Sequence, residues 1–202
     1  MVPFSPPPFQ FDPDDKRTYL LMVFTRTPLV PLAVPEGEDG WLRNVFPSST
    51  GIYALYLTEK PIDEIIGRER LTTPLSVESV ELLAPRIVYV CKTSRGGKLR
   101  DRLGTHYRKI DSRQNISVRH IVCRYLVIPH DWNVLFAEEN LIWAEEISVS
   151  PPPPWNMNGF GSNVPGRGRP GFRAPAATHF DVLYPLRPDA PPEPEVDHDE
   201  DE

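Results

Sequence analysis

Cysteine and long apolar runs are what this sequence contains least of. It has two cysteines, Cys91 and Cys123, and neither a Cys-x-x-Cys motif nor a metal-ligand spacing, so we expect no disulfide framework. Both lie in strand-like apolar runs, which predicts reduced, buried thiols. No run approaches the roughly 18 apolar residues of a membrane span, and the opening segment MVPFSPPPFQ lacks a basic region followed by an apolar stretch. We therefore expect a soluble cytoplasmic protein without membrane contact.

Proline, by contrast, is abundant, with 25 residues in 202 against a usual share of ~5%. The prolines cluster at the two ends of the chain and at 151–154, so they indicate linkers rather than a proline-rich protein. The remaining composition, 40% hydrophobic and 25% charged, predicts one domain with one sizeable core. We place this domain at 49–188, between an N-terminal arm and wrapping segment at 1–48 and an acidic, disordered tail at 189–202.

Charge is distributed unevenly along the chain. The net charge is −6, but the tail at 189–202 holds 8 acidic residues and no Lys or Arg, which leaves a net +2 on the rest. Between Arg86 and Arg124 there are 11 basic residues and two acidic ones. A patch of that density predicts a surface that follows a phosphate backbone. The alternative is that these side chains only solvate a helix and a strand edge.

Hydrophobic patterning predicts strands and helices in alternation. β-Branched and aromatic runs predict strands at 52–57, 87–92 and 118–128. The run at 180–184 is interpreted as a last short strand. The order strand, strand, helix, strand, helix implies an α+β fold, in which a small mixed or antiparallel sheet is flanked by helices.

The two long helices of this fold are predicted from apolar spacing. The first starts near Lys98, and the second runs over about 133–147 before the prolines stop it. The expected inward residues are Leu99, Leu103, Tyr107 and Ile110 in the first helix and Leu135, Leu141 and Ile142 in the second.

Arg102 and His106 are four residues apart, so they project from the same face of the first helix, with the apolar residues opposite or flanking. An arginine in this place can hold a phosphate oxygen with two donors and stays charged at any working pH. The alternative is an ordinary exposed pair. Tyr53 and Tyr89 lie on the first two strands, where each ring faces either a cleft or the core.

Glu138 and Glu139 form an acidic pair in the second helix. One carboxylate completed by water is how Mg²⁺ is commonly held beside a phosphate. The alternative is a pair of exposed helical glutamates. Tyrosine, arginine, histidine and carboxylate together are the groups needed to hydrolyse a phosphodiester with one metal ion.

Several motifs stand in an order that resembles the GIY-YIG nuclease superfamily. More narrowly, they resemble the branch of type II restriction endonucleases, enzymes of restriction–modification systems, whose familiar members cut the palindrome CCGCGG. The motifs are GIYALY at 51–56, VYVCK at 88–92, RLGTH at 102–106, CRYLV at 123–127, EENLI at 138–142, WN at 155–156 with GFG at 159–161, PGRGR at 165–169 and FDVLYP at 180–185. The match covers roughly residues 49–188.

The resemblance implies a catalytic set drawn from separate segments. Its members are Tyr53 and Tyr89 in the two tyrosine roles, Arg102 on the scissile phosphate, His106 against a tyrosine hydroxyl, Glu138 as ligand of one Mg²⁺, and Asn156. Glu138 is preferred to Glu139 because it keeps the three-residue step to Leu141. Tyr53 would take a proton from the attacking water and relay it toward His106, and its pKa, ordinarily ~10, would be lowered by a cation such as Arg102 or Lys92.

The same resemblance implies double-stranded DNA as the partner. The basic residues expected to contact DNA are Lys92, Arg95, Lys98, Arg167 and Arg169. The last two either pair with guanine in a groove or touch only phosphates. Cutting both strands of a palindrome favours a two-fold homodimer.

The chain departs from the family pattern at Cys91, where glycine is expected, in a longer gap between Tyr53 and Tyr89, and in the prolines at 151–154. These departures support a second hypothesis, that the chain is a catalytically inactive GIY-YIG relative acting as a DNA-binding or adaptor protein. A third hypothesis is a globular domain without a nucleic-acid role.

Overall fold

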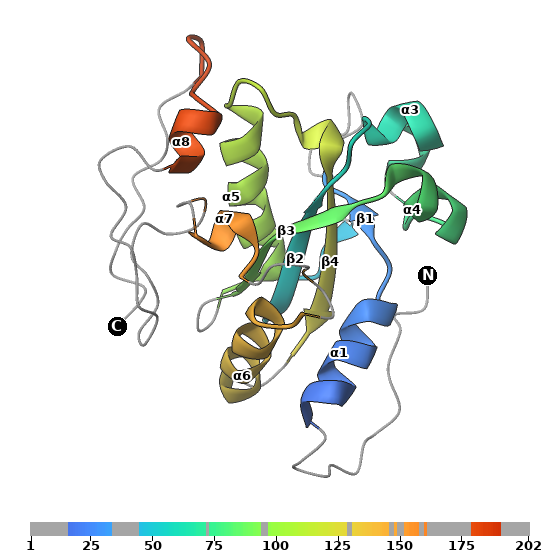
Figure 1. Cartoon of the computed structure of the whole chain (residues 1–202), viewed down its shortest axis with the longest axis vertical. Coiled ribbons are helices and arrows are strands. Elements are labelled where there is room, and N and C mark those ends of the chain that lie inside the picture. Colours follow the sequence, from blue (N-terminus) through green and yellow to red (C-terminus); the bar gives the residue numbers. More distant parts are fainter. Residues whose placement is uncertain are drawn as a thin grey trace.

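A four-stranded antiparallel sheet in the order β1-β4-β2-β3 forms the centre of the structure (Figure 1). The structure is a computed structural model that describes residues 16–33, 45–71, 73–93, 97–128, 131–145, 148, 152–157, 160 and 179–190. The strands are β1 (Val30–Pro31), β2 (Gly51–Leu57), β3 (Arg86–Lys92) and β4 (Ile121–Val127). The helices are α1 (Lys16–Arg26), α3 (Ile62–Ile66), α4 (Val77–Leu83), α5 (Leu99–Asp111), α6 (Asp131–Ile142), α7 (Pro154–Met157) and α8 (His179–Leu183), with 3-10 turns η2 (Arg68–Arg70) and η3 (Val118–His120).

β2 is the inner strand on which the architecture is built. Its sequence, GIYALYL, is rich in aromatic and branched residues, and all of its residues except Leu57 are buried. Such a strand must be covered on both faces, because both faces carry large apolar and aromatic side chains and no charged ones. Gly51 is required at its start, because a Cβ at this position would collide with the backbone carbonyl of Leu126 on β4.

Helices cover both faces of the sheet, so the molecule has three layers (Figure 1). One face packs against α1, α3, α4 and α6 through the side chains of Phe24, Ile62, Leu83 and Leu141. The other face packs against α5, α7 and α8 through Leu99, Leu103, Trp155 and Phe180. Tyr53 and Tyr89 belong to this second face.

The predicted α+β fold is confirmed, together with the strands β2 and β3 and the amphipathic helix α5. The predicted strand at 118–128 is shorter, because 118–120 form a 3-10 turn in which the Ser117 side chain accepts a hydrogen bond from the backbone N–H of Arg119. The N-terminal segment also contributes more than an arm: α1 buries Phe24, and β1 pairs with β4. The domain boundaries themselves stay predictions, and residues 191–202 of the tail lie outside the described residues.

The prediction of a strand at 180–184 is wrong, because these residues form most of α8. Phe180 and Tyr184 point inward four residues apart, and the backbone N–H of Tyr184 donates to the carbonyl of Phe180. Val182, which a strand would place on the same side as these two, is 67% exposed. A five-residue apolar run fits both periods, and the packing of Phe180 decides for the helix.

Two predictions of burial are also wrong. Leu135 was expected to face inward but is 49% exposed, because the buried stripe of α6 runs through Val134, Ala137 and Leu141. Cys91 was expected to be buried, yet its side chain is half-buried, whereas Cys123 is fully buried.

The longest described helix, α5, has 13 residues and is amphipathic, so no helix among the described residues can cross a bilayer.

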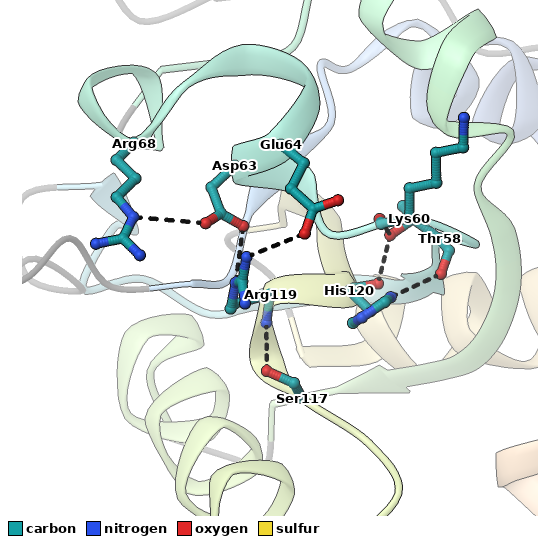
Figure 2. Close-up of polar contacts among 8 residues, drawn as sticks. All are labelled: Thr58, Lys60, Asp63, Glu64, Arg68, Ser117, Arg119 and His120. Atoms are coloured by element: carbon teal, nitrogen blue, oxygen red, sulfur yellow. Dashed lines mark hydrogen bonds and ion pairs between the residues drawn. The ribbon is translucent and has the colours of Figure 1, made fainter.

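A polar cluster holds α3 against η3 at one end of the sheet (Figure 2). Arg119 donates from Nε to Asp63 at 2.8 Å, and its Nη2 lies 3.5 Å from Glu64 Oε1. The Asp63 side chain is only 7% exposed, and Arg68 approaches it from the other side at 3.7 Å. Burial raises the pKa of Asp63, but the hydrogen bond and charge of Arg119, together with Arg68, outweigh burial and lower it.

Asp63→Asn is expected to lower the free energy of unfolding by about 1 kcal/mol at pH 7, because it removes the charge that Arg119 holds. Since the pKa of Asp63 is lowered in the folded protein, this stabilisation is present above the ordinary carboxyl pKa of ~3.9 and disappears as the pH falls through the folded value. Urea unfolding at pH 7 and at pH 3 measures both. Glu64→Gln is the control and should change stability by less than about 0.5 kcal/mol, since its carboxylate is exposed. Equal losses in the two variants at pH 7 would contradict the prediction.

Candidate active site

The regular register between β2 and β3 places the two tyrosines on one face of the sheet. Tyr53 is opposite Cys91 and Leu55 is opposite Tyr89, but Tyr56 is opposite Ile87, so Val88 is the extra residue. Directly opposite residues share a face, as do residues two apart in a strand, so Tyr89 lies on the face of Cys91 and Tyr53, and the bulge begins only beyond Tyr89. The rings of Tyr53 and Tyr89 therefore lie beside each other, with centroids 6.3 Å apart.

His106 on α5 meets the tyrosines from the helix side. Its Nε2 lies 2.6 Å from the hydroxyl oxygen of Tyr53, and its ring packs edge-on against Tyr89 with centroids 5.2 Å apart. His106 is buried together with Leu103 and Ile110 and so belongs to the buried face of α5, which the sequence had left undecided. Its Nδ1 is buried and has no hydrogen-bond partner among the described residues.

Arg102 lies one turn before His106 and flanks that buried face. Its side chain is partly exposed, while its Nε is buried and has no hydrogen-bond partner within the described part of the chain. It interacts electrostatically with Tyr53, Tyr89 and Cys91. An unsatisfied guanidinium donor next to two phenols is suited to donate a hydrogen bond to a phosphate oxygen.

The expectation that a cation lowers the pKa of Tyr53 is not met. Burial raises the pKa of Tyr53 well above its usual value, the neighbouring Cys91 and Tyr89 raise it further, and Arg102 only opposes them. The pKa of Tyr89 is raised in the same way, first by burial and then by Cys91. Lys92 is opposite Ile52 and so lies on the other face of the sheet from Tyr53. Tyr53 is therefore a neutral phenol in this structure, because it has no exposed surface and desolvation penalises the phenolate.

His106 is also neutral. Burial lowers its pKa well below the usual value, and the positive charges of Arg102 and Lys109 lower it further. A neutral imidazole carries one proton, so a hydroxyl that donates to Nε2 leaves the proton on Nδ1. The Tyr53–His106 pair is thus a hydrogen-bonded proton donor and acceptor enclosed in the protein.

Glu138, and not Glu139, faces the sheet. The Glu138 side chain lies on α6 at 5% exposure and interacts electrostatically with Tyr89, whereas Glu139 is exposed. The described residues contain no group of three or more His, Cys, Asp or Glu that could hold a metal ion. A single buried carboxylate still fits Mg²⁺, which commonly takes one or two carboxylates and completes its shell with water.

The side chain of Asn156 on α7 binds both backbone groups of one residue in β3. Its Oδ1 accepts from the N–H of Val90 at 2.8 Å, and its Nδ2 donates to the carbonyl of Val90 at 2.6 Å. Val90 lies between Tyr89 and Cys91, so Asn156 fixes the strand that carries the second tyrosine. Both polar groups of its side chain hold the strand, so the geometry gives Asn156 a positioning part.

Two of the five basic residues expected to contact DNA lie within the described part of the chain. Lys98 is exposed at the residue before α5, and Lys92 is half-buried at the end of β3. Arg95, Arg167 and Arg169 lie outside the described residues.

Sequence reasoning missed Phe160 as a site residue. Its ring stacks on His106 with centroids 4.8 Å apart and packs edge-on against Tyr89 at 4.9 Å. The Gly159-Phe160-Gly161 motif was visible in the sequence, but nothing local indicates that its aromatic ring covers the histidine.

His106 is expected to stay neutral in NMR titrations well below the ordinary histidine pKa of ~6.5. The unfolded chain then takes up the proton first, so stability is complete above ~6.5 and falls by up to about 1.4 kcal/mol per pH unit below it, until the folded pKa is reached. The slope that wild type shows and His106→Gln lacks measures this contribution. An imidazole that titrates at or above ~6.5 in the folded protein would refute the burial argument.

Comparison with known proteins identifies the family to which the chain belongs. Residues 46–201 match the family described as the Eco29kI GIY-YIG domain, a span that contains β2, β3, α5, β4 and α6. A search of curated proteins found no match to the chain. Since the matched span covers most of the 202 residues, the chain belongs to the Eco29kI GIY-YIG family and carries a nuclease domain of the type II restriction endonuclease kind.

Proposed function

We propose that this protein is a sequence-specific endonuclease that hydrolyses phosphodiester bonds in double-stranded DNA with the help of Mg²⁺. The observation that carries the proposal is the enclosed Tyr53–His106 hydrogen bond of 2.6 Å, with the unsatisfied Nε of Arg102 on the same helix. Nucleophilic attack by water needs a base, and the phosphate needs a cation. The Tyr53–His106 pair supplies the base and Arg102 the cation, from one strand and one helix.

In the proposed reaction, Tyr53 takes a proton from the attacking water while it passes its own hydroxyl proton to Nε2 of His106. A phenol that gives and receives a proton in one step does not need a lowered pKa, which removes the difficulty that burial raises it. Arg102 donates to a non-bridging phosphate oxygen. Because the charge of Arg102 is one cause of the lowered His106 pKa, pairing it with a phosphate makes His106 a stronger base when substrate is bound.

Glu138 is the residue that would hold Mg²⁺ together with water. When bound there, the ion supplies positive charge that stabilises the leaving 3′-oxygen. Tyr89, on the bulged strand between Glu138 and Tyr53, then lies against the phosphate. The Tyr53 ring has no exposed surface, so substrate reaches the pair from the half-buried side of Arg102 and Cys91 after these side chains move.

The palindromic target implied by the family resemblance requires two equivalent sites. We propose a two-fold homodimer, since one chain has one such site among its described residues and a palindrome has two scissile bonds. The resemblance does not assign the sequence that this chain recognises, and Arg167 and Arg169 are the residues to examine first for it.

A second candidate function is DNA binding without cleavage. The observation that favours it is Cys91, which stands beside Tyr53 and Tyr89 where glycine is expected. Burial is the largest cause of the raised pKa of both phenols, and Cys91 is the next largest. Plasmid DNA incubated with the protein, once with Mg²⁺ and once with chelator, separates the two. Linear products at fixed sites support the nuclease, and binding without cutting supports the second function. A protein that neither cuts nor binds the plasmid contradicts both functions.

Glu138→Gln is expected to reduce DNA cleavage by at least about 100-fold, because it removes the only charge of the metal-binding group while keeping its size. DNA affinity, measured by fluorescence anisotropy in chelator, should stay within about threefold of wild type. Glu139→Gln is the matched control, one residue away and exposed, and should cleave as wild type does. A Glu138→Gln protein that cuts at the wild-type rate removes Glu138 from the mechanism.

A further inference from the structure

Phe160 forms the wall of the site that lies opposite the sheet. Its ring plane is tilted by only 25° from that of His106, whereas it meets Tyr89 edge-on at 80°. Trp155 packs behind it with centroids 4.6 Å apart. Phe160 is buried, so the imidazole lies between an aromatic face and the hydroxyl of Tyr53 with only 3% of the His106 surface exposed.

Phe180 on α8 supports Phe160 from behind. The two ring centroids are 4.9 Å apart, and Phe180 also packs edge-on against Trp155 at 5.3 Å. Lys109 lies over both rings, with Nζ 5.7 Å from the centroid of Phe160 and 5.6 Å from that of Phe180. The aromatic residues thus connect α8 to His106 through direct contacts.

An ion pair and several backbone bonds fasten this segment to the end of α5. Arg113, whose side chain is nearly fully buried, contacts Asp181 at 2.8 Å and donates to the carbonyl of Tyr184 at 3.2 Å. Gln114 donates from its backbone N–H to the carbonyl of Pro185, and Arg187 donates to that of Ser112. We call residues 180–187 the C-terminal latch.

We propose that the C-terminal latch is a positioning element of the nuclease site, which acts through Phe180 and Phe160 to hold the His106 ring with Nε2 toward the Tyr53 hydroxyl and to keep water from it. The proposal rests on the function proposed above, because it assigns His106 a part in proton transfer. It makes Phe160, Phe180 and Asp181 positioning residues, since they act on His106 through ring contacts and an ion pair.

The need for such support follows from the surroundings of His106. In most histidine sites the second ring nitrogen is fixed by a carboxylate or a backbone carbonyl, which sets the orientation of the ring. Here Nδ1 has no hydrogen-bond partner among the described residues, so ring packing has to do what a second hydrogen bond does elsewhere. Of the rings around His106, Phe160 is the one stacked nearly parallel to it.

Opening the latch should raise the pKa of His106, because water would then solvate its charged form. The titratable and charged groups around the ring are Tyr53 on β2, Tyr89 and Cys91 on β3, and Arg102 and Lys109 on α5, with Glu138 on α6 next to Tyr89. Neither Phe160→Leu nor a substitution in the latch removes any of these groups, but Lys109 lies over the rings of Phe160 and Phe180. A change in the His106 titration therefore reports on access of water and on the position of Lys109.

The test compares Phe160→Leu with Phe46→Leu. Phe46 is as buried as Phe160 and lies in the same apolar cluster, but its ring packs against Tyr125 and not against His106. Both variants should lower the Tm by a similar few degrees. Phe160→Leu alone should move the NMR titration of His106 upward by about one pKa unit and reduce kcat for DNA cleavage about 10-fold, with KM changed less than twofold.

The ion pair is tested in the same way by Asp181→Asn, with Asp189→Asn as control. Asp189 is 83% exposed and lies just outside the latch. Asp181→Asn should shift the His106 titration in the same direction as Phe160→Leu, and Asp189→Asn should leave it unchanged.

The His106 titration is recorded without DNA, so it tests the latch even if the protein does not cut. If Phe46→Leu and Phe160→Leu have the same effect on the titration, Phe160 contributes only to general packing and the proposal is overturned. If folded Asp181→Asn titrates as wild type, the latch does not act on His106 and the proposal fails as well. A shifted titration together with absent cleavage in every variant, wild type included, would support the latch and contradict the nuclease.

Discussion

The hydrogen bond between Tyr53 and His106 is the constraint around which the rest of the structure is arranged. It joins the inner strand of the sheet to α5 where Tyr53 has no exposed surface and His106 has 3%, so both groups are neutral in the folded protein. Burial keeps them neutral by raising the pKa of the phenol and lowering that of the imidazole. In a buried pair of this kind the proton can move from the phenol to the imidazole with little competition from water for their hydrogen bond.

Three features of the fold converge on this pair. The register of β2 against β3 puts Tyr89 on the same face as Tyr53. The apolar stripe of α5 brings His106 down onto that face, while Arg102 stays at the boundary with solvent. Phe160 then covers the imidazole from the third side. Each uses ordinary packing, and the chemistry arises because polar atoms lie where packing alone would have placed apolar ones.

Much of this was predictable from the sequence. The strands β2 and β3 and the helix α5 follow from residue type and spacing, because each is long enough for one period to dominate. The grouping of Tyr53, Tyr89, Arg102 and His106 followed from the order of motifs in a known family, not from spacing alone. The short helix α8 could not be predicted, since five residues fit two periods and the decision comes from Arg113 and Phe160, which are distant in sequence. The raised pKa of Tyr53 was not predictable either, because burial depends on the helices that cover the sheet.

Asn156 has a consequence beyond the site. β3 is the last strand of the described sheet, and an outer strand offers its free N–H and C=O groups to any extended chain that comes near. The amide of Asn156 occupies both groups of Val90, so at this point the sheet cannot be lengthened by a strand from another molecule. The same side chain that steadies the second tyrosine therefore also guards the protein against self-association along its border.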